Sequence, residues 1–344
     1  MGVQITNLLT SRDTSIDELS GKTFAVDSYN MLYQFLTTLR TYDGSPLRDS
    51  KGNITSHISG LFSRTISFMS KGLKLAFVFD GEAPVLKQKE RERRAELKKA
   101  AEAQYEIAKE RKDVEGMKKF AGRTARLTKE MVDETKELLE AFGLPVIQAP
   151  SEGEAQAARM CSNGDVYALI SQDTDCLAFG TPRMVKNLSV SQRKKMNSKL
   201  SYESVKPQLL ELEVNLKNLE LTRDQLIALM MLVGTDFNIG GIKGIGPKNG
   251  LKLVKEHKED FDTLFKEVKW SDFFNYDWQE VFSTIKDMPV TDDYKLEWKP
   301  INEDKIYEIL HDRHEFSKER IKHSLDKLSK IKDAQSQKGL GDFM

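Results

Sequence analysis

Three short apolar runs stand out along the first half of the chain, and amphipathic stretches separate them. The runs are residues 23–26, 75–79 and 166–170. Their length, their β-branched and aromatic content and their lack of apolar–polar alternation are typical of strands that are buried on both faces of a mainly parallel sheet. We therefore expect these segments to form the centre of such a sheet.

Helical patterns fill the intervals between the runs. They cover residues 59–69, 87–111 and 129–142, and the last is followed by Gly143 and Pro145, which commonly stop helices. The alternation predicts an α/β fold with a mainly parallel central sheet flanked by helices and right-handed crossovers.

The second half of the chain changes to a mostly helical pattern. Helices are expected at residues 221–233 and 247–257, on either side of a Gly-rich turn. No Pro/Ser/Gly linker divides this part from the first, so we expect a single domain over residues 1–330. Residues 331–341 are rich in Lys, Ser, Gln and Gly, which predicts that residues 331–344 form a flexible tail.

Charge is unevenly distributed, although 53 basic and 53 acidic residues give a net charge of zero. Residues 87–129 hold 15 basic and 8 acidic residues, residues 183–199 hold 6 basic residues and no acid, and residues 259–312 hold 15 acids and 6 bases. This asymmetry indicates a phosphate-binding face beside an acidic site. The alternative is that each segment is an ordinary helix with a solvated charged face, which could by itself have a similar excess of basic or acidic residues.

Several classes of protein are excluded by what the sequence lacks. No run reaches the roughly eighteen apolar residues that a membrane span needs. The first residues lack the cationic start and long apolar stretch of a secretory signal. The two cysteines, Cys161 and Cys176, form no CxxC pair, so we expect neither a disulfide framework nor a thiolate zinc site. A reducing cell interior is the expected compartment.

Acidic residues follow each of the three apolar runs. Asp27 and Asp80 come directly after the first two runs, and Asp173 and Asp175 follow the third within five residues. Ligands of open α/β sheets bind outside the carboxyl ends of the strands, so we expect these side chains to converge. A single aspartate at a strand end often only caps the next helix or turn, and the inference therefore depends on all three strands.

Three more carboxylates complete a possible cluster. Glu152 and Glu154 precede a helix-forming run, where the spacing of Ser151 and Glu154 predicts a capping box, and Asp236 follows the apolar stretch 226–233 as a turn residue would. Seven carboxylates brought together repel one another unless divalent cations neutralise them. Oxygen ligands without His or Cys favour Mg²⁺ or Mn²⁺, and a pair of such ions indicates phosphodiester hydrolysis.

Eight short segments resemble the motifs of a known family. They are Met1-Gly2-Val3-Gln4, Val26-Asp27-Ser28, Tyr33-Gln34-Phe35, Thr55-Ser56-His57, Val78-Phe79-Asp80-Gly81, Ala149-Pro150-Ser151-Glu152-Gly153-Glu154-Ala155, Gln172-Asp173-Thr174-Asp175-Cys176-Leu177 and Gly241-Ile242-Lys243-Gly244-Ile245-Gly246-Pro247-Lys248. In order and spacing, and over almost the whole chain, they resemble the flap endonucleases among the XPG-type 5′ nucleases. The resemblance implies a PIN-like 5′ nuclease fold, with a helical arch at about 82–130 and a helix-hairpin-helix region at about 222–258.

The resemblance also implies roles for the charged residues. Two Mg²⁺ ions, which Mn²⁺ can replace, would be held by Asp27, Asp80, Glu152, Glu154, Asp173, Asp175 and Asp236. Lys87 and Arg94 would contact the scissile phosphate from the base of the arch. Their seven-residue spacing places them on one helix face with Arg91 and Lys98. A solvated helix whose basic residues pair with acids such as Glu90 explains the same stripe equally well.

Further binding residues follow from the same resemblance. Tyr33 would stack on a base near the cut, although Tyr29, Leu32, Tyr33 and Leu36 also form an ordinary helical core stripe. Duplex DNA would be bound, together with a monovalent cation such as K⁺, at a Gly-rich turn over residues 240–250, which includes Gly244, Gly246 and Lys248. Gly234 and Asp236 are further expected DNA contacts.

The last residues of the sequence resemble a motif that docks on a sliding clamp (PCNA). The contacts would come from Gln337, Leu340, Phe343 and Met344. The family usually carries a second aromatic residue in place of Met344. Gly153 also departs from the family pattern, which often has Ala, and we expect Gly153 to touch no metal ligand.

The function implied is that of a Mg²⁺-dependent endonuclease. It would cut 5′ DNA flaps at junctions of single strand and duplex, in Okazaki fragment maturation and DNA repair, as a monomer without membrane contact. The expected compartment is the cytoplasm of an archaeal-type prokaryote or the nucleus of a eukaryote. The alternatives are a 5′ exonuclease or gap nuclease of the same superfamily, and a clamp-bound junction binder without catalysis.

Overall fold

A seven-stranded sheet forms the centre of the computed structural model, which describes residues 5–188, 193–195 and 202–341. The strand order is β1-β9-β6-β5-β2-β3-β4. Strands β2 to β6 run parallel, and β9 pairs antiparallel with both β6 and β1. Their bounds are β1 Arg12–Asp13, β2 Thr23–Asp27, β3 Lys74–Phe79, β4 Val146–Gln148, β5 Ala168–Ile170, β6 Arg183–Lys186 and β9 Gln208–Glu211. The predicted α/β class with a mainly parallel sheet is confirmed.

The predicted apolar runs are the three adjacent central strands β5, β2 and β3. Alternate residues of each strand enter two separate cores: in β2, Phe24 and Val26 join one buried cluster and Ala25 joins the other. Burial on both faces explains why these runs show no apolar–polar alternation. Strand β5 begins at Ala168, two residues later than expected.

One face of the sheet is covered by α2 (Ser28–Thr38), α3 (Ser56–Met69) and α6 (Lys129–Ala141). The other face is covered by α7 (Gly153–Ser162) and α9 (Arg223–Val233), whose apolar residues belong to the second core. Two shorter helices, α1 (Ile16–Leu19) and α8 (Leu212–Leu219), and the small β7–β8 ribbon (Arg193–Lys195 and Tyr202–Ser204) complete this part.

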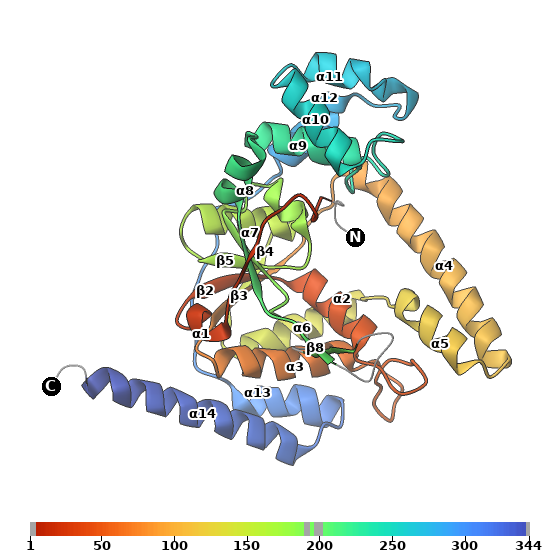
Figure 1. Ribbon diagram of the computed structural model, residues 1–344. Helices are drawn as coiled ribbons and strands as arrows, with labels where there is room; N and C mark the ends of the chain where they lie inside the picture. The colour runs from red at the N-terminus through yellow and green to blue at the C-terminus, as the bar shows by residue number, and fades with distance from the viewer. Residues whose placement is uncertain (1–4, 189–192, 196–201, 342–344) are drawn as a thin grey trace.

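A long helix leaves the body of the molecule after β3 (Figure 1). The 3₁₀ turn η1 (Val85–Lys87) leads into α4 (Gln88–Glu110), and α5 (Val114–Ala121) returns toward α2 through the turn η2 (Gly122–Thr124). The returning segment rests on the loop after α2, where the Lys118 Nζ lies 3.9 Å from the Tyr42 ring centroid. On α4, the hydroxyl of Tyr105 lies 3.3 Å from that of Ser45.

A small helical group packs around α9 at one end of the sheet (Figure 1). It contains α10 (Pro247–His257), α11 (Phe261–Glu267), the turn η4 (Trp270–Asp272) and α12 (Trp278–Lys286). Helix α9 begins with a capping box, in which the Thr222 hydroxyl accepts from the Gln225 amide and the Gln225 side chain accepts from the Thr222 amide. Aromatic residues hold the group together, with the rings of Phe265 and Trp278 stacked at 4.8 Å.

The C-terminal helices pack against α3 and α6 on the opposite side of the sheet from this group (Figure 1). They are α13 (Glu303–Tyr307), the π-helical turn η5 (Glu308–Arg313) and α14 (Lys318–Gly341). The backbone stays helical through residues 331–341, where composition predicts a flexible tail. Lys, Gln and Ala are good helix formers and no proline interrupts them, so the helix continues from its packed first half. In the part of the chain described, no helix is long and apolar enough to cross a membrane.

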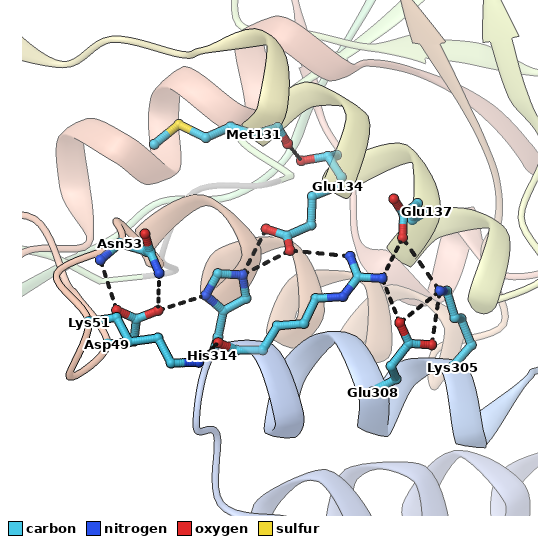
Figure 2. A network of polar contacts seen from close by, with 11 residues as sticks. Asp49, Lys51, Asn53, Met131, Glu134, Glu137, Lys305, Glu308 and His314 are labelled. Atoms are coloured by element: carbon cyan, nitrogen blue, oxygen red, sulfur yellow. Dashed lines mark hydrogen bonds and ion pairs between the residues drawn. The ribbon is translucent and has the colours of Figure 1, made fainter.

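An ion-pair network fastens the C-terminal helices to the body (Figure 2). The two ring nitrogens of His314 lie 3.0 Å from Asp49, in the loop before α3, and 2.8 Å from Glu134, on α6. Arg313 adds a contact of 2.9 Å to Glu137. The hydrogen bond with Glu134, assisted by that with Asp49, raises the pKa of His314, while burial lowers the pKa of nearby His57 to about 4.

We expect His314→Gln to destabilise the protein more at pH 6 than at pH 9. A raised folded-state pKa stabilises most below the unfolded value, near 6.5, and this stabilisation is lost as the pH rises through the folded value. Losing two charge-assisted hydrogen bonds should lower the free energy of unfolding by about 1–2 kcal/mol at pH 6. Urea unfolding at both pH values measures the difference.

The exposed His323 on α14 provides the matched control, since His323→Gln should have a small effect at both pH values. His57 has the opposite effect on stability, because a histidine whose pKa is lowered in the folded state destabilises the protein as the pH falls. This effect is the same in wild type and in the variant, so it cancels in the comparison. An effect of His314→Gln that is equal at pH 6 and pH 9 would contradict a charged His314 in the network.

Candidate functional site

Three aspartates meet at one edge of the sheet because they follow three adjacent parallel strands. Asp27 ends β2, Asp80 follows β3 and Asp173 follows β5, and all three line one cavity. Each also accepts a backbone amide: Asp27 from Asn30 at 3.0 Å, Asp80 from Gly153 at 2.7 Å and Asp173 from Asp175 at 3.3 Å. The capping and convergence interpretations are therefore compatible, since one carboxylate oxygen accepts an amide while the group faces the cavity.

The predicted capping box at Ser151 and Glu154 is wrong. Helix α7 begins at Gly153, so Glu152 is the N-cap residue and Ser151 lies outside the cap. The Ser151 hydroxyl instead donates to the carbonyl of Glu82 at 2.8 Å, which ties the start of α7 to the segment after β3. Glu154 is therefore not engaged in a cap, and it accepts from the Ser171 hydroxyl at 2.9 Å.

The cavity at this edge has a volume of about 860 Å³ and contains every carboxylate that the sequence singled out. Helix α4 and the α5–η2 segment also line it. The acidic lining residues are Asp27, Asp80, Glu152, Glu154, Asp173, Asp175 and Asp236. Among the described residues, no three His, Cys, Asp or Glu side chains are grouped closely enough to hold a metal ion as they stand. The carboxylates share a cavity without forming a closed ligand cage.

Two cations from the base of α4 reach the carboxylates on one side of this cavity. The Lys87 Nζ lies 2.5 Å from Glu152 and 3.6 Å from Asp236, and Arg94 donates to both oxygens of Asp236 at 2.8 Å. Burial alone would lower the pKa of Lys87, but the attraction and hydrogen bond of Glu152 outweigh it, so the pKa is raised. Lys87 therefore stays charged.

The deeper carboxylates have raised pKa values. Burial, and then repulsion by Asp80, raises the pKa of Asp27 to about 7. Burial, and then repulsion by Glu152, raises the pKa of Asp80 to about 6, and burial with the charge of Asp173 raises that of Glu154 well above its usual range. Because these groups resist carrying charge together, the deep end of the cavity favours any added cation. The donors are carboxylate oxygens alone, and this chemistry fits Mg²⁺ or Mn²⁺.

Ser171 was not predicted from the sequence, and Gly153 was expected to make no contact with a metal ligand. The buried Ser171 hydroxyl bridges Glu154 and Asp27, at 2.9 and 3.4 Å, and accepts from the Asp173 amide at 3.1 Å. Gly153 does contact an expected metal ligand, contrary to the sequence interpretation, because its amide binds Asp80 and an added Cβ would lie 2.7 Å from the same oxygen. A hydroxyl two residues before Asp173 at a strand end was the available signal for Ser171.

Basic and aromatic residues also line the cavity, among them most of those singled out from the sequence. Tyr33 faces it, with the Lys98 Nζ 5.1 Å from the centre of its ring, and Tyr29 lines it as well. Arg93 lines the cavity, whereas Arg91, predicted to share the face of Lys87 and Arg94, is exposed. The structure therefore brings Lys87, Arg94 and Lys98 of the predicted stripe to the cavity and leaves Arg91 out of its lining.

The Gly-rich turn lies between α9 and α10, and of its predicted residues only Asp236 lines the cavity. Gly234 has φ 111°, and an added Cβ would lie 2.6 Å from the Gly241 amide nitrogen, so the turn requires glycine there. Gly244, Gly246 and Lys248 are exposed, and no atom lies within 4 Å of a Cβ added at either glycine. The turn is therefore open to solvent at Gly244 and Gly246, just before α10.

The predicted tail motif is described only in part. The backbone of Gln337 and Leu340 belongs to the last turns of α14. Phe343 and Met344 lie outside the described residues.

We expect Ser171→Ala to weaken divalent-cation binding by about 10- to 100-fold, as the loss of an outer hydrogen bond to a ligand commonly does. Without the hydroxyl, Glu154 and Asp27 lose the bridge that sets their spacing. Mn²⁺ titration by calorimetry measures the effect, and Ser171→Thr, which keeps the hydroxyl, is the control. Equal affinities of the alanine variant and wild type would show that the bridge does not position these carboxylates.

Comparison with known proteins gives consistent matches. Residues 1–101 match the XPG N-terminal domain and residues 143–236 the XPG I-region. Flap endonuclease 1 of Pyrococcus abyssi is 47% identical over 99% of this chain and 97% of its own length, and that of Hyperthermus butylicus is 46% identical over 96% and 95%.

Solved structures agree. The flap endonuclease-1 structure from Methanococcus jannaschii is 40% identical, with a TM-score of 0.75, over 97% of this chain and all of that one. The catalytic core of Rad2 in complex with DNA substrate is 25% identical, with a TM-score of 0.66, over 94% and 97%. The carboxylate-lined cavity beneath α4 and this full-length similarity lead to one conclusion: the chain belongs to the flap endonuclease family of XPG-type nucleases.

Proposed function

We propose that this chain, a structure-specific flap nuclease by family, cleaves 5′ DNA flaps by Mg²⁺-dependent hydrolysis of a phosphodiester bond. The observation that carries the proposal is one cavity that is lined by seven carboxylates together with Lys87 and Arg94. Acidic groups that need cations, beside basic groups that can bind a phosphate, are the two halves of such a site. Okazaki fragment maturation and DNA repair are the processes in which this activity is used.

The proposed metal ligands are the seven carboxylates already described, with Asp27, Asp80 and Asp173 at the strand ends as the central members. Two bound divalent cations would supply an activated water and stabilise the departing oxygen. The raised pKa values of Asp27 and Asp80 support this assignment, because burial has left carboxylates without enough positive charge around them. Mn²⁺ has the same preference for oxygen ligands and is expected to substitute.

The basic residues are proposed to bind the substrate phosphate. Lys87 presents a compact ammonium group and Arg94 a planar fork that suits phosphate oxygens. Both now pair with carboxylates of the cavity, Lys87 with Glu152 and Arg94 with Asp236, so they already point at the position where a phosphate would meet those carboxylates. Tyr33, on the cavity wall, offers a ring on which a base next to the cut would stack.

DNA is proposed to be recognised through its backbone and its junction shape. The exposed residues Gly244, Gly246 and Lys248 would bind the phosphates of the duplex. Gly234 and Asp236, nearer the cavity, and K⁺ as an added cation would complete this contact. The arch, at about 82–130, would cover the single-stranded flap. One nuclease domain over residues 1–330, working as a monomer, would contain all of these parts.

We expect Asp173→Asn to reduce cleavage of a 5′-labelled flap duplex by at least about a hundredfold in Mg²⁺, since it removes a central ligand and its charge. Gel analysis of single-turnover reactions gives the rate. Asp133→Asn, on the exposed face of α6, is the control and should cut as wild type does. Full activity of the Asp173 variant, or an inactive wild type with Mg²⁺, would refute the proposal.

The C-terminal residues are proposed to bind a sliding clamp. The motif consists of Gln337, Leu340, Phe343 and Met344, of which the two apolar residues Leu340 and Phe343 would enter a groove on the clamp.

Truncation after Ser336 should abolish clamp binding and leave cleavage of the free flap substrate unchanged, because the cavity lies in the preceding residues. Surface plasmon resonance on an immobilised clamp measures binding, and the flap assay is the control. Clamp binding that survives the truncation would place the contact elsewhere.

A further inference from the structure

Glu90 is a buried carboxylate at the base of α4. Only 3% of the residue is exposed, although it lies on a helix that is otherwise highly charged and largely exposed. Its Oε2 accepts from the Arg93 Nε at 2.6 Å, and its Oε1 accepts from Arg93 at 2.8 Å and from the Arg94 Nε at 2.6 Å. Burial alone would raise the pKa of Glu90, but these hydrogen bonds and charges lower it, so the group is an anion that binds two guanidinium groups.

An ordinary helix-surface pair does not account for this arrangement. Acid–base pairs three or four residues apart usually stabilise a helix by about 0.2–0.5 kcal/mol, and an acid in the first turn also interacts well with the helix dipole. Both effects occur in solvent and require no burial. Here the acid is buried. One of the arginines that it binds, Arg94, also donates a hydrogen bond to Asp236, which lies 142 positions away in the sequence.

Arg94 is held at two points by carboxylates on two different elements. Its Nε donates to Glu90 on its own helix, and its terminal nitrogen donates to both oxygens of Asp236, in the turn after α9. A planar guanidinium fixed at two points has a defined direction as well as a defined position. Asp236 is a proposed metal ligand, and a bound metal ion would compete with Arg94 for its carboxylate. Glu90 has no such second role, so it is the partner that would still hold Arg94 in the working enzyme.

Among the described residues that line the cavity, Arg93 and Arg94 are present and Glu90 is not. Any effect of Glu90 on the reaction must therefore pass through the arginines. We propose that Glu90 is a positioning residue, which holds Arg94 toward the scissile phosphate and keeps Arg93 beside it on the cavity wall. This inference rests on the proposed flap nuclease function, because it assigns the support of one of its phosphate-binding residues.

Glu90→Gln tests the proposal, since it keeps the size of the side chain and removes its charge. We expect the single-turnover rate of flap cleavage to fall about 10- to 100-fold, with less than a threefold change in the Kd for flap DNA measured in Ca²⁺. The exposed Glu96, two turns along α4, is the matched control, and Glu96→Gln should keep the wild-type rate.

A double-mutant cycle with Arg94→Ala separates positioning from folding. If Glu90 acts through Arg94, Glu90→Gln should lower the rate of the Arg94→Ala variant by less than about threefold. An equal loss in both backgrounds, or no loss in the wild-type background, would overturn the proposal.

Nuclear magnetic resonance of the arginine Nε–H groups decides the matter without any substrate. The Arg93 and Arg94 signals, assigned by single Arg→Lys variants, should be protected from exchange in wild type and in Glu96→Gln, and should lose this protection in Glu90→Gln. Unchanged signals in Glu90→Gln would overturn the positioning role. An inactive wild type with the expected signals would instead refute the proposed function and leave the contact established.

Discussion

The repulsion among carboxylates at the ends of three adjacent parallel strands is the constraint on which the rest of the site depends. Asp27, Asp80 and Asp173 cannot move apart, because the register of β5, β2 and β3 is set by the buried apolar residues on both faces. Burial raises the pKa of Asp27 and Asp80 and makes the repulsion stronger. The fold must therefore bring positive charge to this edge, and α4 carries part of it.

The elements around the sheet serve that requirement in different ways. Helix α7 turns its first amide toward Asp80, and the Ser171 hydroxyl bridges two further acids, so the carboxylates are spaced by neutral hydrogen bonds. Lys87 and Arg94 neutralise Glu152 and Asp236, at the side of the cavity nearest the arch. The deep side has no comparable ion pair to Asp27 or Glu154 among the described contacts, and it is the place where added cations gain most.

Some of the site was predictable because short-range chemistry carries it. The apolar runs and the aspartates after them indicated strand ends, and the three aspartates do meet at one edge of the sheet. Two errors concerned which residue takes part within a segment that was otherwise predicted correctly. Ser151 lies one residue before the cap of α7, and Arg93 lies on the cavity wall beside Arg94 where Arg91 was expected.

The sequence by itself determined the class of fold and the acidic residues that line the cavity, because strand burial and the acids at strand ends are encoded in local runs of residues. Only the tertiary structure decided which strands are neighbours, that Glu90 is buried, and that Arg94 spans from α4 to Asp236. The strand neighbours and the span of Arg94 depend on contacts between distant residues, such as Phe24 with Ala168 and Arg94 with Asp236. No local pattern records such a contact, because its energy arises only when the folded core brings both partners together.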